Sequence, residues 1–378
     1  GEPFPLGYVD QNNTPHGPFQ LDNTKIRNKW ITVARSLGSP IDSVQWEPCL
    51  LAGIQADGYY QAFERGDIGY CGTGEAAVSY DYTTFLPRII ASEDANAWNS
   101  TVSIRNVSSS SPTMVSITFL TRDGRILDSR LHTGLAANAT WEVGVRGILY
   151  DQFLSRADSN SVFEGSAVVA SDQDVAVVVR TEKSDRVTAY TGLSMLDPGS
   201  GWGRPATIFY APTMMWNAWG TSWKSYLYIQ NTTSDPANLT VTYCYQDNPA
   251  SCHNETSLPS LPPFGSARVD PGSEMGSGFW GFARVSSTNG KALAVVVTQE
   301  EDTAGASDYN ALSSGATKVY LPSLMYSRYN WSSSFTVQNL GSQTTYVDVT
   351  YYGDNGQNYG CRLTNLSPGA SCLVTQGG

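Results

Sequence analysis

The stretch that decides the fold reads Trp223-Lys-Ser-Tyr-Leu-Tyr-Ile-Gln-Asn231 and, a few residues later, Leu239-Thr-Val-Thr-Tyr243. In both segments aliphatic residues such as Leu227, Ile229 and Val241 recur at every second position. A period of two sends one set of side chains to a buried face and the other toward water, as in a half-solvated antiparallel sheet. The stretch therefore predicts two paired strands.

The same pattern occurs three times in the 378 residues, and internal repetition of this kind fixes the architecture of a chain. Each copy has a triplet ending in proline, a tryptophan, an asparagine that ends the first segment, and a β-branched residue central to the second. Tryptophan and asparagine are eight residues apart in every copy, and the asparagine and the central residue are eleven, ten and ten apart. The positions are Phe85-Leu86-Pro87, Trp98, Asn106 and Ile117; Tyr210-Ala211-Pro212, Trp223, Asn231 and Val241; and Tyr320-Leu321-Pro322, Trp331, Asn339 and Val349.

The first two copies continue with further matching segments. These are Gly165-Ser-Ala-Val-Val169 beside Gly281-Phe-Ala-Arg-Val285, and Val175-Ala-Val-Val-Val179 beside Leu293-Ala-Val-Val-Val297. The valine runs predict central strands covered on both faces. Successive triplets begin 125 and 110 residues apart, from 85 to 210 and from 210 to 320, which is the size of an immunoglobulin-like domain. We therefore expect an all-β chain of tandem immunoglobulin-like antiparallel β-sandwiches.

The third copy stops at Gly378 without counterparts of the last two segments, so it looks like half a sandwich. Half a sandwich would expose an apolar face and unpaired strand edges. Three explanations stay open: the chain is a fragment of a longer protein, another segment of this chain or of a neighbouring subunit completes the sheet, or the copy is a small disulfide-stapled cap. The expected domains are an extended arm at 1–28, a small disulfide-linked β domain at 29–82, repeats at 83–200 and 201–315, and the incomplete repeat at 316–378.

Composition and charge exclude several partners. A net charge of -11 disfavours nucleic acid, because binding to phosphates depends on Lys and Arg. No apolar run is long enough for a membrane span, and the sequence opens at Gly1 rather than Met, so we expect a signal peptide or propeptide to have been removed. We therefore expect an extracellular or cell-surface protein.

The six cysteines form three sequence-local pairs without zinc-like spacing, which predicts disulfides and an oxidising compartment. The expected pairs are Cys49 with Cys71, Cys244 with Cys252, and Cys361 with Cys372. Nine N-x-[S/T] sequons predict glycosylation of exposed loops, although Asn, Ser and Thr are also common in turns. The sequons are Asn12, Asn99, Asn106, Asn138, Asn231, Asn238, Asn254, Asn330 and Asn365. Because Asn339 is no sequon, the repeated asparagine is better explained by a turn that uses its tolerance of left-handed backbone.

From about residue 83 to residue 378, the chain resembles tandem repeats of uncharacterised secreted bacterial surface proteins. The resemblance is carried by the triplet opening, the strand that ends in asparagine, a V-T-Y-Y strand as at 349–352, and the G-S-A-V-V and A-V-V-V elements. It implies extracellular β-sandwich modules and carries over no catalytic residue.

Catalytic groups are scarce. The three histidines lie outside any G-x-S-x-G or H-E-x-x-H setting, so we expect no enzyme. Glu182 and the Glu300-Glu301-Asp302 run would be the carboxylates for glycoside hydrolysis, yet their similar placement in two copies favours repetition of structure. We expect no cofactor, although the loops at 172–174 and 354–356 offer oxygen ligands to a structural calcium ion. The second of these is more typical of a hairpin turn.

The leading hypothesis is a structural subunit of an extracellular filament, pilus-like fibre or surface layer, whose partners are copies of itself. Assembly would be head-to-tail, by strand complementation of the incomplete third repeat. The strands best suited to insertion lie in or near the N-terminal arm, with Phe19, Leu21, Trp30, Ile31 and Val33. The alternative is a carbohydrate-binding surface adhesin, with Trp216, Trp219, Tyr59 and Tyr60 as the sugar-stacking candidates.

Overall fold

The computed structural model describes the backbone of residues 8–9, 15–16, 45–51, 54–63, 66–71 and 77–80, and backbone and side chains of most later residues. The later ranges are 82–146, 162–195, 204–321, 324 and 333–375, except 93, 95, 185, 234, 247, 256–257, 259, 303–304, 354–355 and the side chain of 133. Contacts divide the chain into two compact units, residues 1–198 with 262–266 and residues 199–261 with 267–378, and each is described by itself. The described residues confirm an all-β chain of several antiparallel sheets.

The N-terminal strands form two small antiparallel sheets. One pairs β1 (Tyr8–Val9) with β2 (Pro15–His16), and the other contains, in chain order, β3 (Gln45–Leu51), β4 (Ile54–Phe63), β5 (Gly66–Cys71) and β6 (Ala77–Tyr80). The predicted Cys49–Cys71 disulfide and the rings of Tyr59 and Tyr60 depend on side chains outside the described residues. The strand-donor candidates Phe19, Leu21, Trp30, Ile31 and Val33 and the sequons Asn12 and Asn330 also lie outside them.

Repeat 1 forms two antiparallel sheets in the first unit. The strand order is β10-β9-β12-β7-β15 in one sheet and β11-β8-β13-β14 in the other. The strands are β7 (Tyr82–Ser92), β8 (Asn99–Asn106), β9 (Thr113–Leu120), β10 (Ile126–Leu135), β11 (Thr140–Gly144), β12 (Val162–Ser171), β13 (Val175–Lys183), β14 (Arg186–Thr191) and β15 (Leu193–Ser194).

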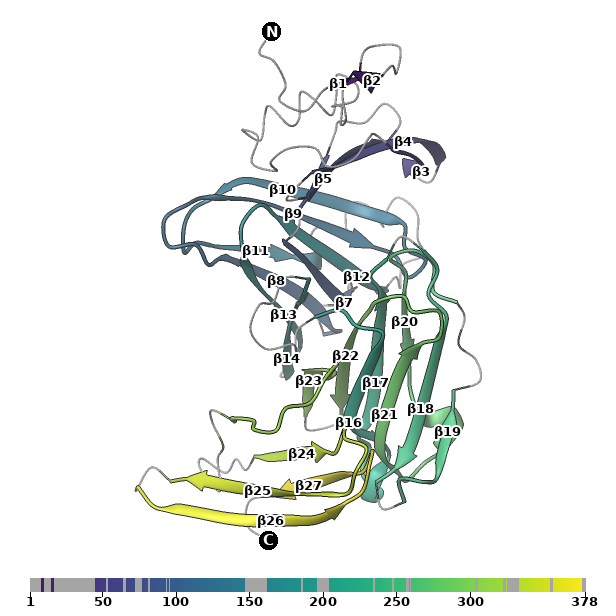
Figure 1. Cartoon of the computed structure of the whole chain (residues 1–378), viewed down its shortest axis with the longest axis vertical. Coiled ribbons are helices and arrows are strands. Elements are labelled where there is room, and N and C mark those ends of the chain that lie inside the picture. The colour runs from purple at the N-terminus through teal and green to yellow at the C-terminus, as the bar shows by residue number, and fades with distance from the viewer. Residues whose placement is uncertain are drawn as a thin grey trace. The chain divides into compact units, whose positions relative to one another are not determined.

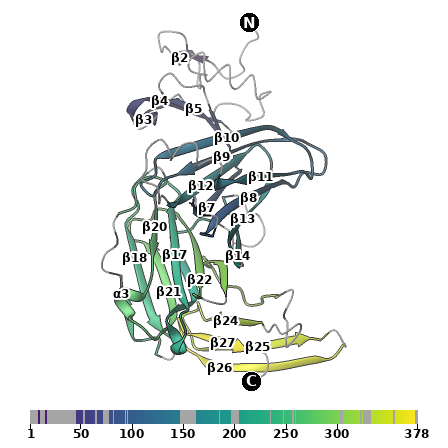
Figure 2. The same ribbon diagram turned by 180° about the vertical axis from the view of Figure 1, so that it is seen from behind.

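Repeat 2 has the same strand order in the second unit, except that an isolated bridge of Tyr210 with Leu312 takes the place of β15. Both groups of strands are joined into one eight-stranded sheet through a single residue pair, Trp216 with Lys224. The order is β19-β18-β21-β16-β17-β22-β23, and β20 pairs with β17 (Figures 1 and 2). The elements are β16 (Ile208–Trp216), the 3-10 turn η1 (Ala218–Gly220), β17 (Lys224–Asn231), β18 (Leu239–Tyr245), β19 (Cys252–Asn254), β20 (Ser266–Val269), the helix α3 (Gly272–Met275), β21 (Phe279–Ser287), β22 (Leu293–Glu300) and β23 (Ala306–Asn310).

The proline of each complete repeat lies in a β-bulge. In β7, Pro87 and Arg88 stand opposite one residue of β12, and in β16, Pro212 and Thr213 stand opposite one residue of β21. A bulge tolerates proline because the ladder hydrogen bond is already interrupted there.

A tyrosine hydroxyl from the end of the same repeat satisfies the backbone that each bulge frees. Tyr190 Oη donates to the Arg88 carbonyl (2.6 Å) and accepts from its N–H (3.2 Å). Tyr309 Oη does the same at Thr213, at 2.7 and 3.4 Å. The bulge at the proline triplet and the distant tyrosine therefore form the same contact in both repeats. The sequence shows that both features recur, but not that they touch.

The two valine runs have different surroundings. In β22 every residue from Leu293 to Gln299 is buried, as predicted for a central strand covered on both faces. In β13 buried and exposed residues alternate, and Val178 is 38% exposed. The prediction was therefore wrong for repeat 1, where the outer face of this strand faces solvent. A continuous apolar run by itself does not report whether a second layer covers it.

The described residues of repeat 3 form two separate two-stranded ribbons in the second unit, drawn in yellow in Figure 1. The strand β24 (Ser334–Gln338) pairs with β27 (Ser371–Thr375), and β25 (Thr345–Tyr352) pairs with β26 (Asn358–Leu366). Gly353 N–H donates to the Gln357 carbonyl (2.8 Å), and Gly356 has a φ of 77°, so the predicted turn reverses the chain between β25 and β26.

Candidate functional site

The asparagine repeated in all three copies is a buried connector at the end of a strand. Asn231 Nδ2 donates to the carbonyls of Asp235 (2.7 Å) and Leu261 (3.3 Å), and its Oδ1 accepts from the Thr233 N–H (3.0 Å). Equivalent bonds join Asn106 to Ser108, Ser111 and Leu135, and join Asn339 to Gly341, Gln343 and Leu366. The predicted turn role is correct, but none of the three has a left-handed backbone. The asparagines act through their side chains, as in an Asx turn.

This arrangement corrects the glycosylation prediction at two sequons. Asn106 and Asn231 are each 0% exposed, and both Nδ2 hydrogens are used, so neither amide is available to carry a glycan in the folded chain. The Asn99 amide is also engaged, with the carbonyls of Asp94 and Ala97. The exposed sequon asparagines among the described residues are Asn138, Asn238, Asn254 and Asn365.

The two ribbons of repeat 3 correspond to the outer strands of the complete repeats. β24 with β27 matches β8 with β11, and β25 with β26 matches β9 with β10 and β18 with β19. In the complete repeats the other edge of each outer pair is covered by an inner strand: β13 and β22 pair with β8 and β17, and β12 and β21 pair with β9 and β18. Within the described residues, β24 and β25 have no such partner.

The side chains of these open strands are correspondingly uncovered. Ile117 and Val241, at the centre of β9 and β18, are 0% exposed, whereas the equivalent Val349 of β25 is half-buried. On the first strand, Ile104 and Ile229 are 0% exposed and the equivalent Val337 is half-buried. Repeat 3 therefore presents the apolar face that repeats 1 and 2 bury, which is a feature that normally marks an interaction surface.

The opening triplet of repeat 3 is uncovered as well. Val319, Tyr320 and Leu321 are 50%, 74% and 44% exposed and form no strand. The equivalent Phe85 and Leu86 are 3% and 0% exposed within β7, where they pair with β12. The same inner strand that β25 lacks would also be the partner of this segment.

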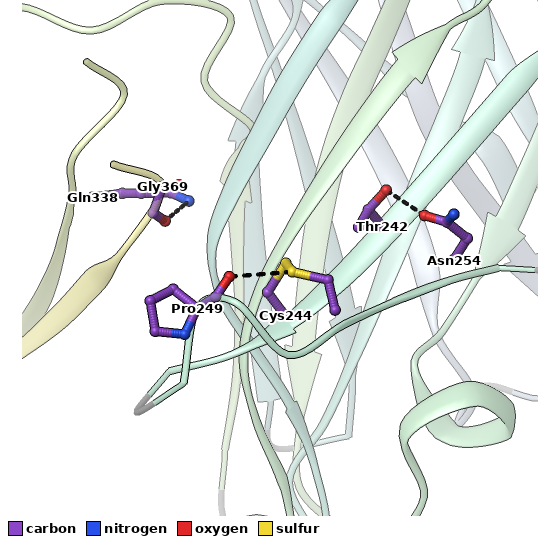
Figure 3. Close-up of a disulfide and its surroundings, with 7 residues drawn as sticks. Thr242, Cys244, Pro249, Asn254, Gln338 and Gly369 are labelled. Carbon is purple, nitrogen blue, oxygen red and sulfur yellow. Dashed lines mark hydrogen bonds between the residues drawn. A yellow bond between two sulfur atoms is a disulfide. The ribbon is translucent and has the colours of Figure 1, made fainter. Parts of the chain in front are cut away.

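A hydrogen bond joins repeat 3 to repeat 2 beside a small group of buried side chains. Leu366, Ala370 and Val374 are at most 7% exposed, and Gln338 Nε2 donates to the Gly369 carbonyl at 3.0 Å (Figure 3). The hydroxyl of Ser371 donates to Gln246 Oε1 at the end of β18. The ribbons are therefore held at one end while their apolar faces stay open.

The disulfide predictions have mixed outcomes. Cys244 and Cys252 form a disulfide across β18 and β19, with a Cα–Cα distance of 4.1 Å (Figure 3). Cys361 and Cys372 are free thiols, contrary to the predicted pair. The reason is register: Cys361 pairs with Val349 in one ribbon and Cys372 with Val337 in the other, so closeness in sequence does not place them on adjacent strands.

The two tryptophans considered for sugar stacking have different environments. The Trp216 ring lies against Gly272, whose added Cβ would be 2.4 Å away, and packs edge-on to Tyr226 at 5.9 Å. Trp219 is 58% exposed, 5.0 Å from the Trp280 ring, and has φ 54° and ψ 27°. A left-handed backbone is costly for tryptophan and is often associated with function. Of the two candidates for sugar stacking, Trp219 is therefore the one whose ring is accessible to a ligand.

The acidic groups considered for catalysis or calcium are held in local contacts. Glu182 is exposed and pairs with Arg180 (3.3 Å), and Asp302 pairs with Lys224 (3.8 Å). Asp172 Oδ1 accepts from the Met114 N–H at 2.9 Å, so this carboxylate tethers a loop of repeat 1. In the described ranges, no three His, Cys, Asp or Glu side chains lie together in a way that would hold a metal ion.

Comparisons with models of protein families, with curated proteins and with solved structures find no match to this chain. Among the helices that the structure describes, none is long and apolar enough to cross a membrane.

Proposed function

We propose that the chain is a structural subunit whose third repeat is completed by strands of a second copy, giving an extracellular filament or surface layer. On this proposal each complete repeat is an immunoglobulin-like sandwich and repeat 3 is the outer half of one. The observation that carries it is the pair of open strands, β24 and β25, whose counterparts are covered in both complete repeats.

The partner that this proposal requires is an inner strand for repeat 3, and the inner strands of repeats 1 and 2 cannot provide it. The inner strands β12, β13, β21 and β22 are each paired on both edges within their own repeats or with their own hairpin partners, so they are not available to repeat 3. Strand addition satisfies the free backbone groups of an edge while alternate side chains fill the apolar face. Full burial of an exposed large side chain contributes about 1.5–3 kcal/mol. Side chains that are already half-buried, such as Val349, gain only part of this. A donor from a second copy gives a heterologous contact, which builds an open chain unless rotation closes it into a ring.

An extracellular location belongs to the same proposal. It is supported by the Cys244–Cys252 disulfide, because such bonds persist in oxidising compartments. Fractionation of the native source, with non-reducing and reducing gels, tests this; recovery of reduced protein from the cytoplasm only would refute it.

The assembly proposal is tested with charge placed on either face of β25. Val349→Lys puts an ammonium on the face that a partner would cover, and Thr350→Lys puts it on the exposed opposite face of the same strand. Sedimentation velocity over a concentration series and negative-stain microscopy should show polymers of the parent chain and of Thr350→Lys, and monomers of Val349→Lys. Monomers of the parent at every concentration, or unaltered polymers of Val349→Lys, would rule the proposal out.

Saccharide binding at Trp219 is a second candidate function, favoured by an exposed ring on strained backbone next to Trp280. Aromatic rings stack on the apolar faces of sugars, and removing an exposed ring should leave the fold intact. A glycan array should therefore show binding by the parent chain that Trp219→Ala loses, with Trp216→Phe as the matched control. Absence of binding by the parent, or retention by Trp219→Ala, would eliminate this function.

A further inference from the structure

The inner strands β12 and β21 share a pattern of four residues, which are a phenylalanine, a glycine, an alanine and a valine at every second position. β12 contains Phe163-Glu-Gly165-Ser-Ala167-Val-Val169, and β21 contains Phe279-Trp-Gly281-Phe-Ala283-Arg-Val285. Both read F-x-G-x-A-x-V, and the four specified residues alternate along the strand, so they lie on one face. This pattern defines what fits between the neighbouring strands.

The glycine is required by its neighbours. A Cβ added at Gly165 would lie 2.2 Å from the Leu120 carbonyl oxygen and 2.6 Å from the Phe163 ring. At Gly281 the equivalent distances are 1.9 Å to the Cys244 carbonyl oxygen and 2.9 Å to the Phe279 ring. The phenylalanine two residues earlier thus folds over the glycine, and the two residues form one unit.

The alanine and the valine are set by the two strands on either side. Ala167 pairs with Leu86 of β7 and with Phe119 of β9, and it is 0% exposed, which leaves room only for a methyl group beside an aromatic ring. Ala283 is likewise 0% exposed, between Ala211 and Tyr243. Two residues later Val169 and Val285 pair with Ile117 and Val241 at the centre of the core.

These registers transfer residue by residue onto repeat 3. In β25, Tyr352 is equivalent to Leu120 and Cys244. Tyr351 is equivalent to Phe119 and Tyr243, and Val349 is equivalent to Ile117 and Val241. On the other side, the alanine would pair with Leu321 and the valine with Val319, both of which are exposed. One inserted strand would therefore cover β25 and the opening triplet together.

We infer that repeat 3 binds an extended segment with the spacing G-x-A-x-V, preferably preceded by phenylalanine, between β25 and Val319–Leu321 and antiparallel to both. The inference rests on the proposed function, and it assigns the donor to residues 74–78 of a second copy, Gly74-Glu-Ala-Ala-Val78. In this sequence the spacing otherwise occurs only in β12, in β21 and at 265–269, the last of which includes β20, already paired with β17.

The donor assignment has two features that can be checked. β6, which begins at Ala77, is an end strand of its sheet, and among the described strands it pairs with β5 alone, although it also contacts β12. The phenylalanine position of the pattern holds Gly72, so the natural donor lacks the ring that packs on the glycine. A donor without this ring should bind more weakly, which suits a contact between copies that forms and dissociates reversibly.

The first experiment tests the pattern with peptides and the full chain held below its assembly concentration. A peptide of residues 162–171 should slow hydrogen exchange of residues 319–321 and 345–352 at least about tenfold, and its Gly165→Val version should not. Equal effects of the two peptides, or no protection by the first, would overturn the inferred pattern.

The second experiment tests the donor in the full chain. Gly72→Phe supplies the missing ring and should lower the concentration needed for assembly about tenfold, whereas Gly74→Val should abolish assembly while hydrogen exchange in repeats 1 and 2 stays unchanged. Polymers that form equally well with Gly74→Val would refute this donor but leave the proposed function standing. Peptide binding by a parent chain that never assembles would refute the proposed function but leave the pattern standing.

Discussion

Repeats 2 and 3 have the same outer strands but different neighbours. Val241 and Val349 occupy equivalent places on β18 and β25, and each lies ten residues after a buried asparagine. Val241 is fully buried, and its strand pairs with β21, whereas Val349 is half-buried beside an edge that no described strand covers. The comparison shows that alternation selects the face of a strand that is apolar, while the next strand decides whether that face is buried.

The largest effect should come from removing the space that an inner strand needs. Gly281→Val places side-chain carbon against the Cys244 carbonyl and the Phe279 ring, and we expect repeat 2 to lose more than about 4 kcal/mol of stability. Hydrogen exchange along β18 and β21 would report it. Gly144→Val is the matched control, since an added Cβ meets nothing within 4 Å there. Similar losses from both variants would contradict this explanation.

Removing the asparagine side chain that ends the first strand of a repeat should lower the free energy of unfolding by a smaller amount. Asn231→Ala leaves the carbonyls of Asp235 and Leu261 and the Thr233 N–H without these partners, and we expect a loss of about 2–4 kcal/mol. Asn339→Ala should cost about half as much, because water reaches the half-exposed strands of repeat 3. Segment-resolved hydrogen exchange compares the two. A larger effect in repeat 3 would show that the exposed strands are not what distinguishes the repeats.

The same valine-to-alanine substitution in repeats 2 and 3 measures how much the neighbouring inner strand contributes to stability. Val241→Ala should destabilise β18 by about 2 kcal/mol, and Val349→Ala should destabilise β25 by less than about 1 kcal/mol in the monomer. If assembly completes repeat 3, the two costs should become similar in the polymer. Hydrogen exchange of both strands before and after assembly is the measurement, and a difference that persists in the polymer would count against strand addition.

The smallest effect concerns the hydroxyl that closes the bulge. Burial raises the pKa of Tyr309 above its ordinary 10, and the hydrogen bond that its oxygen accepts from the Thr213 N–H lowers it by less. The resulting stability is complete below pH 10 and is lost as pH rises through the higher value of the folded state. Tyr309→Phe should cost about 1 kcal/mol at neutral pH and flatten the alkaline decline of repeat 2. Denaturant titrations at pH 8–11.5 test this; an unaltered slope would assign the decline to other groups.

The sequence predicted the features that depend on local pattern, and it missed those that depend on neighbours. Alternation and fixed spacing at Asn106, Asn231 and Asn339 were sufficient for the strands and the repeats. The buried bonds of these asparagines run to carbonyls up to 30 residues away, so no local pattern could have revealed them.

The other differences have the same origin. Val178 lies in a valine run like that of β22, but only the structure shows that its side of the sheet faces solvent. Cys361 and Cys372 are close in sequence but lie in different ribbons, whereas Cys244 and Cys252 face each other across a hairpin. Among the described residues, the open edges of β24 and β25 are those that the missing counterparts of the last two segments would pair with in the alignment of the copies.

The asparagine connectors also constrain how the protein can be produced. A host that attaches glycans to nascent chains meets the sequons at Asn106 and Asn231 before any strand has formed, when both amides are accessible. A sugar on either nitrogen would prevent the paired bonds to the chain and could not be enclosed at a site with no exposed surface. Modification there would stop folding, so recombinant work on this chain calls for a host without that pathway.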